Sequence, residues 1–394
     1  MSSPTTLSLR DYLHPPAIAA GFTAVLIGYS GSAVIVFQAA MAAGASVEQF
    51  AGWMMVLGLG MGVTCIGLSL RYKMPIITAW STPGAALLVT SLGDITLAEA
   101  TGAFLLSASL ITLSGITGWF ERVMDRIPLP LAAGMLAGIL FQFGVDAFTS
   151  METRLGLVAA MFAVYLVAKI LIPRYTIILV LGVGLTLCQW QGLLEFSQVT
   201  LSFALPRAVM PEFSTGALIG VGIPLFVVTM VSQNIPGIAV LRTAGYHAPI
   251  SPLLSWTGLT TLLLAPFGGF AYNLAAITAA ICTGPEAHAD HDKRYVAGLS
   301  TGVCYLLLGI FSSLVASLFS AFPAEFVLAL AGLALLSTIA NSLYTAVADD
   351  RVREAAVITF VVTASGLSLF GIGAAFWGLV AGVVANLVFS RIKK

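Results

Sequence analysis

Two stretches of the chain place helix-starting residues and small residues within strongly apolar surroundings. In "AWSTPGAALL" (79–88), Ser81 or Thr82 offers a side-chain oxygen that can cap a helix, and the proline that follows suits a first helical position. In "AYNLAAITAA" (271–280), Asn273 stands in the corresponding place. A helix start carries unpaired N–H groups and the positive end of the helix dipole. The two stretches together therefore predict a binding site for an anion that needs no lysine.

Two other segments add polar side chains to apolar runs. "VVTMVSQNIPG" contains Gln233 and Asn234, whose amides are costly at bilayer depth unless they are paired or functional. Hydrogen bonding between helices is the alternative interpretation. "GYSGSAVIVFQ" supplies Tyr29 and Ser30, although a serine there is also typical of a small packing position. We include these four residues in the candidate site.

The elements that position these residues are expected to be membrane helices. The chain has 394 residues, of which 59% are hydrophobic and 9% charged, and its mean hydropathy is +1.00. Soluble domains carry about 25% charged residues, so this composition excludes a soluble globular protein and places the chain in a lipid bilayer. The formal net charge is zero, which gives no basic face for nucleic acid.

Metal and enzyme chemistry find little support in the sequence. The four cysteines lie far apart, and no pair has metal-ligand spacing. The densest polar run, "GPEAHADHDKR" at 284–294, matches no strong zinc pattern and is predicted to be a cytoplasmic loop. The paired aspartates of "VADDRVRE" (347–354) also fall in a predicted inside loop, with arginines beside them. We predict no metal, no cofactor and no enzymatic activity.

Apolar runs broken by glycine, proline and charge predict an all-α membrane protein with fourteen transmembrane segments, since a spanning helix needs roughly 20 apolar residues. With both termini in the cytoplasm, all of the 17 Lys and Arg residues except Arg154 and Arg207 lie on the inside, as the positive-inside rule requires. The predicted segments are 17–43, 50–70, 76–92, 96–120, 128–148, 153–172, 175–191, 214–241, 250–267, 269–284, 295–320, 323–345, 354–371 and 373–390.

The segments divide into two sets of seven, which predicts an inverted repeat. A repeated unit with an odd number of spans must enter the membrane from the opposite face the second time, as is usual in secondary transporters. The first repeat is expected over 1–205 and the second over 206–394, so the two opening stretches fall in the third span of each half.

The third and tenth spans are predicted to be broken. Residues 75–80 and 266–272 each form an extended entry, followed by a helix that starts near mid-membrane. Extended backbone at that depth is tolerated only inside protein or beside a cavity. A continuous helix kinked at Pro83 is the alternative interpretation.

Four stretches match a known family. They are "HPPAIAAGFTAVLIGYSGSAVIVFQAA", "PIITAWSTPGAALL", "VSQNIPGIAVLR" and "FGGFAYNLAAITAAICTG". Through them essentially the whole chain resembles the benzoate–proton symporter (BenE) family of bacterial inner membranes. That family is similar in fold to the uracil and nucleobase–ascorbate transporters and to the sulfate/bicarbonate carriers. The resemblance implies a core domain (spans 1–4 and 8–11) beside a gate domain (spans 5–7 and 12–14), and a homodimer as the common assembly.

The resemblance also implies that substrate lies between the third and tenth spans, against the eighth. In the uracil carriers the eighth span offers a glutamate where this chain has Gln233, and the tenth offers another near Asn273. A neutral site suits an anion, because a nearby carboxylate would repel it. Carried over residue by residue, the site involves Ser81, Thr82, Gly84, Gln233, Asn234, Tyr272 and Asn273.

Together these features predict a secondary active carrier that imports benzoate or a similar aromatic carboxylate with a proton. The proton could enter on the carboxyl group of the substrate, or a peripheral residue such as Glu286 or His288 could relay it. The alternative is a carrier or channel for another small anion or a nucleobase.

Overall fold

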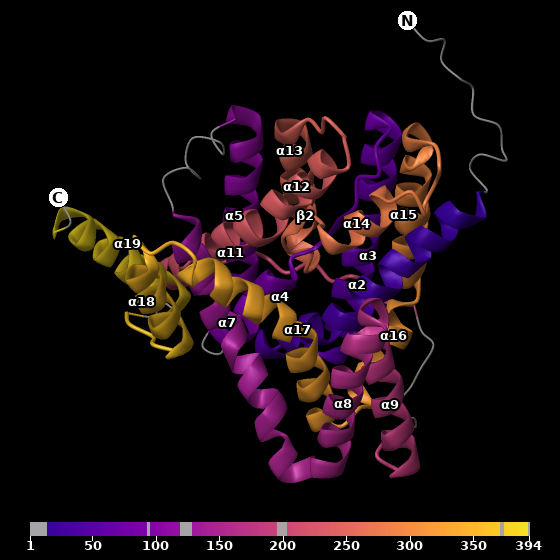
Figure 1. Cartoon of the computed structure of the whole chain (residues 1–394), viewed down its shortest axis with the longest axis horizontal. Coiled ribbons are helices and arrows are strands. Elements are labelled where there is room, and N and C mark those ends of the chain that lie inside the picture. The colour runs from indigo at the N-terminus through magenta and orange to yellow at the C-terminus, as the bar shows by residue number, and fades with distance from the viewer. Residues whose placement is uncertain (1–13, 93–94, 119–127, 195–202, 371–373, 393–394) are drawn as a thin grey trace, which may run out of the picture.

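The computed structural model describes residues 14–92, 95–118, 128–194, 203–370 and 374–392 (Figure 1). Regular structure in these ranges is almost entirely helical, with two strands of three residues each. The first half of the chain contains α2 (Pro15–Ala42), α3 (Val47–Tyr72), β1 (Thr78–Trp80), α4 (Thr82–Ser91), α5 (Leu97–Thr117), α7 (Leu129–Thr149), α8 (Met151–Leu171), the 3₁₀ turn η1 (Pro173–Tyr175) and α9 (Thr176–Trp190).

The second half begins with one long run of helix that changes its winding twice. The run comprises α10 (Thr215–Ala217), the π-helical turn η3 (Leu218–Gly222), α11 (Ile223–Thr229), the π-helical turn η4 (Met230–Asn234) and α12 (Ile235–Thr243). It is followed by α13 (Ile250–Leu264), the 3₁₀ turn η5 (Ala265–Phe267), β2 (Tyr272–Leu274), α14 (Ile277–Thr283), the 3₁₀ turn η6 (His291–Lys293), α15 (Tyr295–Ile310), α16 (Ser312–Ser320), α17 (Ala324–Val347), α18 (Arg353–Ala364) and α19 (Ala374–Ile392).

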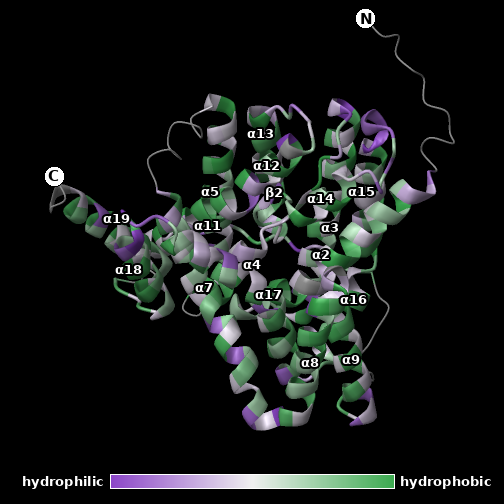
Figure 2. Ribbon diagram, in the orientation of Figure 1, coloured by the Kyte–Doolittle hydropathy of each residue, from purple (hydrophilic) through white to green (hydrophobic). Residues whose placement is uncertain are grey.

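Seven helices within the described ranges are long and apolar enough to cross a membrane, and the number is nine if each of two bent helix pairs counts as one span. Hydrophobic residues cover most of their length, as Figure 2 shows. The prediction of fourteen spans is therefore not confirmed by helix length. Several of the predicted segments are short helices here: α4 has 10 residues, α14 has 7, and α18 has 12.

The helices pack in pairs around the two strands. In Figure 1, α3 lies beside α15 and α5 beside α13 in the upper part of the molecule, while α7 packs against α17 in the lower part. The α3–α15 pair is close because glycines face each other. A Cβ atom on Gly58 would lie only 2.7 Å from the Cα atom of Gly309. The strands and α4 lie in the middle, between the two parts.

Extended backbone occurs in both segments that were predicted to be broken. In the second segment, however, it lies later in the sequence than the predicted stretch 266–272. β1 ends the predicted extended stretch 75–80. In the second segment, residues 265–267 form the 3₁₀ turn η5, Gly268 turns the chain with a φ of +86°, and the strand occupies 272–274. The prediction that a helix begins directly after Asn273 was wrong, because residues 272–274 pair with β1 and α14 begins only at Ile277.

Candidate functional site

The two strands form an antiparallel ribbon in which Trp80 is opposite Tyr272 and Ala79 opposite Asn273. Two further backbone bonds extend the pairing: the N–H of Ser81 donates to the carbonyl of Ala271 (3.1 Å), and that of Ala275 donates to Ile77 (2.9 Å). Because the strands are antiparallel, α4 and α14 leave the ribbon at opposite ends. Their first turns are separated by roughly 10 Å of strand.

The start of α4 is capped by its own sequence. The hydroxyl oxygen of Ser81 accepts a hydrogen bond from the N–H of Gly84 (3.0 Å) and another from the hydroxyl of Thr229 on α11 (3.1 Å). Of the two predicted caps, Ser81 is therefore the one used, and Thr82 is the first residue of the helix. Both Ser81 and Gly84 are buried behind the first turn.

The start of α14 has no side-chain cap. The N-cap residue is Ala276, so the prediction that Asn273 caps this helix was wrong. Asn273 lies in β2, where its amide nitrogen donates to the carbonyl of Ala271 (2.9 Å) and its buried side-chain oxygen has no partner within the described residues. The strand continues past the expected helix start and leaves α14 only seven residues.

A cavity of about 580 Å³ lies against both helix starts. On one side its wall comes from α2, the ribbon, α4, η4, α14 and α15, and on the other from α7, α9 and α17. None of the described residues that line it is charged. The polar side chains among them are Ser32, Trp80, Thr82, Ser232, Gln233, Thr278, Tyr305, Thr338, Asn341, Ser342 and Thr345.

Two of the predicted site residues, Thr82 and Gln233, line this cavity. Gln233 belongs to η4, and single π-helical turns of this kind occur frequently at functional sites. The neighbouring Asn234 turns away from the cavity. Its side-chain oxygen accepts the N–H of Leu274 (2.9 Å), and its nitrogen approaches the sulfur of Met230 at 3.2 Å. It thereby ties η4 to β2.

The two tyrosines among the predicted site residues, Tyr29 and Tyr272, do not line the cavity. The hydroxyl of Tyr272 donates to the carbonyl of Val56 on α3 (2.7 Å), which holds the β2 end of the ribbon against that helix. The ring of Tyr29 meets Trp80 edge-on, with 5.1 Å between the ring centres. Ser30 donates to Ile27 of its own helix, as a packing serine does.

Ser32, a polar residue of the same stretch as Tyr29 and Ser30, accepts a hydrogen bond from the indole N–H of Trp80 (3.0 Å) and so orients that ring on the cavity wall. Sequence reasoning did not identify several other lining residues. Thr278 and Tyr305 lie near the start of α14. On α17 the polar residues Thr338, Asn341, Ser342 and Thr345 follow one helix face, and their i, i+3, i+4, i+7 spacing in an apolar helix was the available signal.

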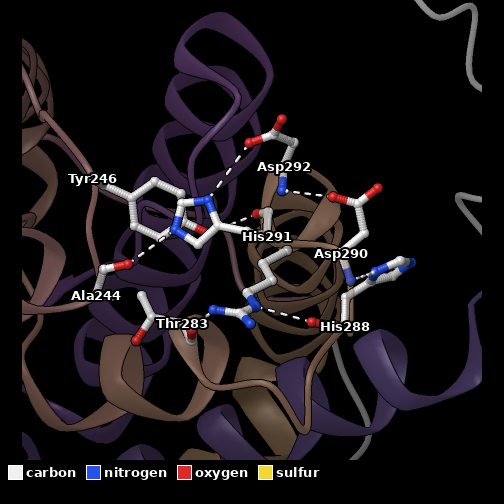
Figure 3. A network of polar contacts seen from close by, with 8 residues as sticks. Ala244, Tyr246, Thr283, His288, Asp290, His291 and Asp292 are labelled. Carbon is white, nitrogen blue, oxygen red and sulfur yellow. Dashed lines mark hydrogen bonds and ion pairs between the residues drawn. The ribbon is translucent and has the colours of Figure 1, made fainter.

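The loop from 284 to 294 supports the other end of α14 (Figure 3). The guanidinium group of Arg294 donates to the carbonyls of Thr283 (2.8 Å), the last residue of α14, and of His288 (2.9 Å). The hydroxyl of Tyr246 donates to the carbonyl of His291 (2.8 Å), and the His291 ring contacts the carbonyl of Ala244 at the end of α12 (2.9 Å). The loop therefore connects the ends of α12 and α14.

Titratable groups in this loop network respond to burial. Burial, followed by the nearby His14 ring, lowers the pKa of His288, and the two ring centres are 4.1 Å apart. Burial also raises the pKa of Tyr246 to about 12. Across the described residues, no group of three His, Cys, Asp or Glu side chains is arranged to hold a metal ion.

Comparison with known proteins decides the family. A family model described as "Benzoate membrane transport protein" (BenE) matches residues 11–388. The chain belongs to the BenE family. Its resemblance to that family in sequence is thus confirmed, and the chain is a multi-pass membrane transporter rather than an enzyme.

Two relatives cover nearly the whole chain. The inner membrane protein YdcO of Escherichia coli (strain K12) is 51% identical over 381 residues, which are 96% of this chain and 97% of that protein. The benzoate membrane transport protein of Acinetobacter baylyi (strain ATCC 33305 / BD413 / ADP1) is 41% identical over 377 residues, 96% of each chain. The name of the first relative agrees with the predicted inner-membrane location.

Solved structures share the fold of this BenE family member at low sequence identity. SLC26A9 matches with a TM-score of 0.67 and 13% identity, over 98% of this chain and 66% of that chain. The transmembrane domain of the cyanobacterial bicarbonate transporter BicA matches with a TM-score of 0.57 and 14% identity, over 97% of this chain and 98% of that chain. The helical fold is therefore that of known membrane transporters.

Proposed function

We propose that the protein is a secondary active transporter that imports benzoate or a similar aromatic carboxylate together with a proton. The observation that carries the proposal is the uncharged cavity of about 580 Å³ beside two helix starts. Its size falls within the usual range for small-molecule sites. The name of the A. baylyi relative supplies the substrate class.

In this proposal the carboxylate group lies near the start of α4 or α14, where unpaired N–H groups favour an anion. The aromatic ring then contacts the apolar wall, which includes Trp80 of β1 and Leu136 of α7. Thr82 and Gln233 contribute polar contacts from the cavity wall. The other predicted site residues do not line the cavity, and in this proposal they shape its wall from behind. They are Ser81, Gly84, Asn234, Tyr272, Asn273, Tyr29 and Ser30.

Alternating access fits this location, because the cavity is lined by two sets of helices. We propose that spans 1–4 and 8–11 form a core domain that moves against a gate domain of spans 5–7 and 12–14. The same proposal includes two inverted repeats of seven spans, 1–205 and 206–394, with both termini in the cytoplasm of a bacterial cell. A homodimer is part of it too, since carriers of similar fold commonly pair.

Proteoliposomes test the transport reaction. With an inward proton gradient, they should accumulate labelled benzoate, and a protonophore should abolish the accumulation. Uptake that is indifferent to the gradient would remove proton symport. Accumulation of labelled bicarbonate or uracil, without accumulation of benzoate, would favour the alternative, a carrier for another small anion or a nucleobase. Two of the structural neighbours are a bicarbonate transporter and an anion transporter, which is why this alternative is included.

Replacement of cavity residues tests the location of the site. Gln233→Leu should raise the apparent KM for benzoate or stop uptake while the protein remains inserted, because Gln233 lines the cavity. Asn273→Leu should do so only indirectly, through the ribbon. Normal transport by both variants would mean that substrate binds elsewhere.

A further inference from the structure

One corner of the cavity holds two hydroxyl side chains that lack partners. Tyr305 of α15 and Thr278 in the first turn of α14 both line the cavity, and they are only 3% and 5% exposed. The hydroxyl oxygen of Thr278 is buried without a hydrogen-bond partner within the described part of the chain. The same range contains no partner for the Tyr305 hydroxyl. A buried polar group without a partner is unfavourable, and a bound ligand can satisfy it.

A glycine on α2 brings the two side chains into the same corner. A Cβ atom on Gly28 would lie 3.0 Å from the methyl group of Thr278 and 3.7 Å from the hydroxyl oxygen of Tyr305. Both side chains therefore pack against the bare backbone of α2 at this position. Figure 1 shows α2, α14 and α15 next to one another, in agreement with their packing contacts.

The chemistry of this corner suits a carboxylate. Phenol and threonine hydroxyls can each donate a hydrogen bond, and no charged side chain among the described lining residues competes for or repels an anion. The other strong donor nearby, the indole N–H of Trp80, is already engaged by Ser32. Hydrogen bonds to an ionised acceptor are about twice as strong as those between neutral groups.

We propose that Tyr305 and Thr278 donate hydrogen bonds to the carboxylate of the substrate, and that Gly28 holds them in position to do so. These three residues then determine specificity for an anionic substrate. The inference rests on the proposed function, because it takes benzoate as the ligand.

The test measures benzoate binding to purified protein by calorimetry and benzoate uptake in proteoliposomes. Tyr305→Phe should weaken benzoate binding about tenfold or more, and Thr278→Val several-fold, because each loses a hydrogen bond to a charged group. Matched controls are Tyr165→Phe and Thr257→Val, which change buried residues away from the cavity and should bind benzoate like the wild type.

Gly28→Ala provides an independent variant that keeps both hydroxyls. Its methyl group should displace Thr278 and weaken benzoate binding several-fold, whereas Gly156→Ala, where nothing lies within 4 Å of the added carbon, should have no effect. Melting temperatures identify any variant that fails to fold, and the other two then decide the result.

The outcomes separate the two proposals. Wild-type benzoate affinity in Tyr305→Phe, Thr278→Val and Gly28→Ala would overturn the inference while leaving the proposed function in place. Absence of benzoate binding by the wild-type protein would overturn both. Selective loss in the three cavity variants, with normal controls, supports the assignment.

Discussion

The two strand–helix junctions of the site pair with each other but are stabilised in different ways. At the β1–α4 junction, Ser81 follows the strand directly and caps a helix of 10 residues. At the β2–α14 junction, no side chain caps the helix, which has 7 residues. Contacts from distant segments support this second junction instead: Asn234 binds the strand, and Arg294 binds the end of the helix.

The difference shows that the start of α4 is capped by its own sequence, with one added bond from Thr229, whereas the start of α14 has no cap and is held by tertiary contacts. A capped helix start needs only its own neighbouring residues. The β2–α14 junction needs η4 on one side and the 284–294 loop on the other. Substitutions at the two junctions should therefore change the stability of the protein by different amounts. At the β2–α14 junction, substitutions farther along the sequence should also have an effect.

The largest effect is expected from Asn234→Leu. Removal of the side-chain oxygen leaves the buried N–H of Leu274 without a partner, which should cost about 1–3 kcal/mol of stability. The melting temperature in detergent should fall, and benzoate binding should weaken as β2 loosens. Gln233→Leu, one residue earlier, is the matched control. Gln233 lines the cavity, so this variant should lose transport while its melting temperature stays near the wild-type value.

An unchanged melting temperature in Asn234→Leu would show that η4 does not support β2. The β2–α14 junction would then depend on Arg294 and the 284–294 loop rather than on η4.

Loss of the cap in Ser81→Ala should have the next largest effect. The variant loses the bond to the N–H of Gly84 and leaves the buried hydroxyl of Thr229 unpaired, so about 1–2 kcal/mol of destabilisation is expected. Ala276→Ser places a hydroxyl at the start of α14, but the backbone there is helical (φ −96°, ψ −57°) rather than extended as at Ser81, so the melting temperature should stay near the wild-type value. Equal effects of opposite sign would mean that both junctions depend on capping alone.

These contrasts explain how much of the site the sequence could predict. Ser81 was identifiable because a serine before Thr-Pro-Gly is a local signal with a known mechanism. The start of α14 was misplaced because pairing with β1 extends the strand past Asn273, and strand pairing depends on a segment almost 200 residues away.

The span count and the cavity wall show the same limit. Hydropathy identified the long apolar helices, yet broken and short helices such as α4 and α14 cannot be recognised as spans by length. Tyr305 gave no motif of its own, since a single polar residue in an apolar helix has the same appearance whether it faces a cavity or another helix.

Arg294→Gln should have a smaller effect, about 1 kcal/mol. The guanidinium group stabilises the carbonyl end of α14, but it is only partly buried, so solvent reduces its contribution. A lowered melting temperature is the expected result. Arg351→Gln is the matched control, because Arg351 pairs with Asp349 at the surface and should contribute almost nothing. Equal melting temperatures in the two variants would remove the 284–294 loop from the support of α14.

The smallest effect is a pH dependence of the same loop. Burial and the His14 ring lower the pKa of His288 in the folded protein, while the unfolded chain keeps a value of about 6.5. The folded state therefore favours neutral His288, so this stability is complete above about pH 6.5 and is lost as the pH falls through the lowered pKa. Around the ring, Asp290 favours its charged form, and His14 and Lys293 oppose it.

The melting temperature of the wild-type protein should decrease between pH 7.5 and 5.5, and that of His288→Asn should decrease less. The His288 ring also accepts the N–H of Asp290 (2.9 Å), a bond that is lost when the ring is protonated and that asparagine can partly replace. His247→Asn serves as a control, since it removes a histidine from the neighbouring α12–α13 connection and leaves this bond intact. If the melting temperatures of wild type and His288→Asn change identically with pH, the acid sensitivity belongs to another group. Arg294 would then be the part of the loop on which α14 depends.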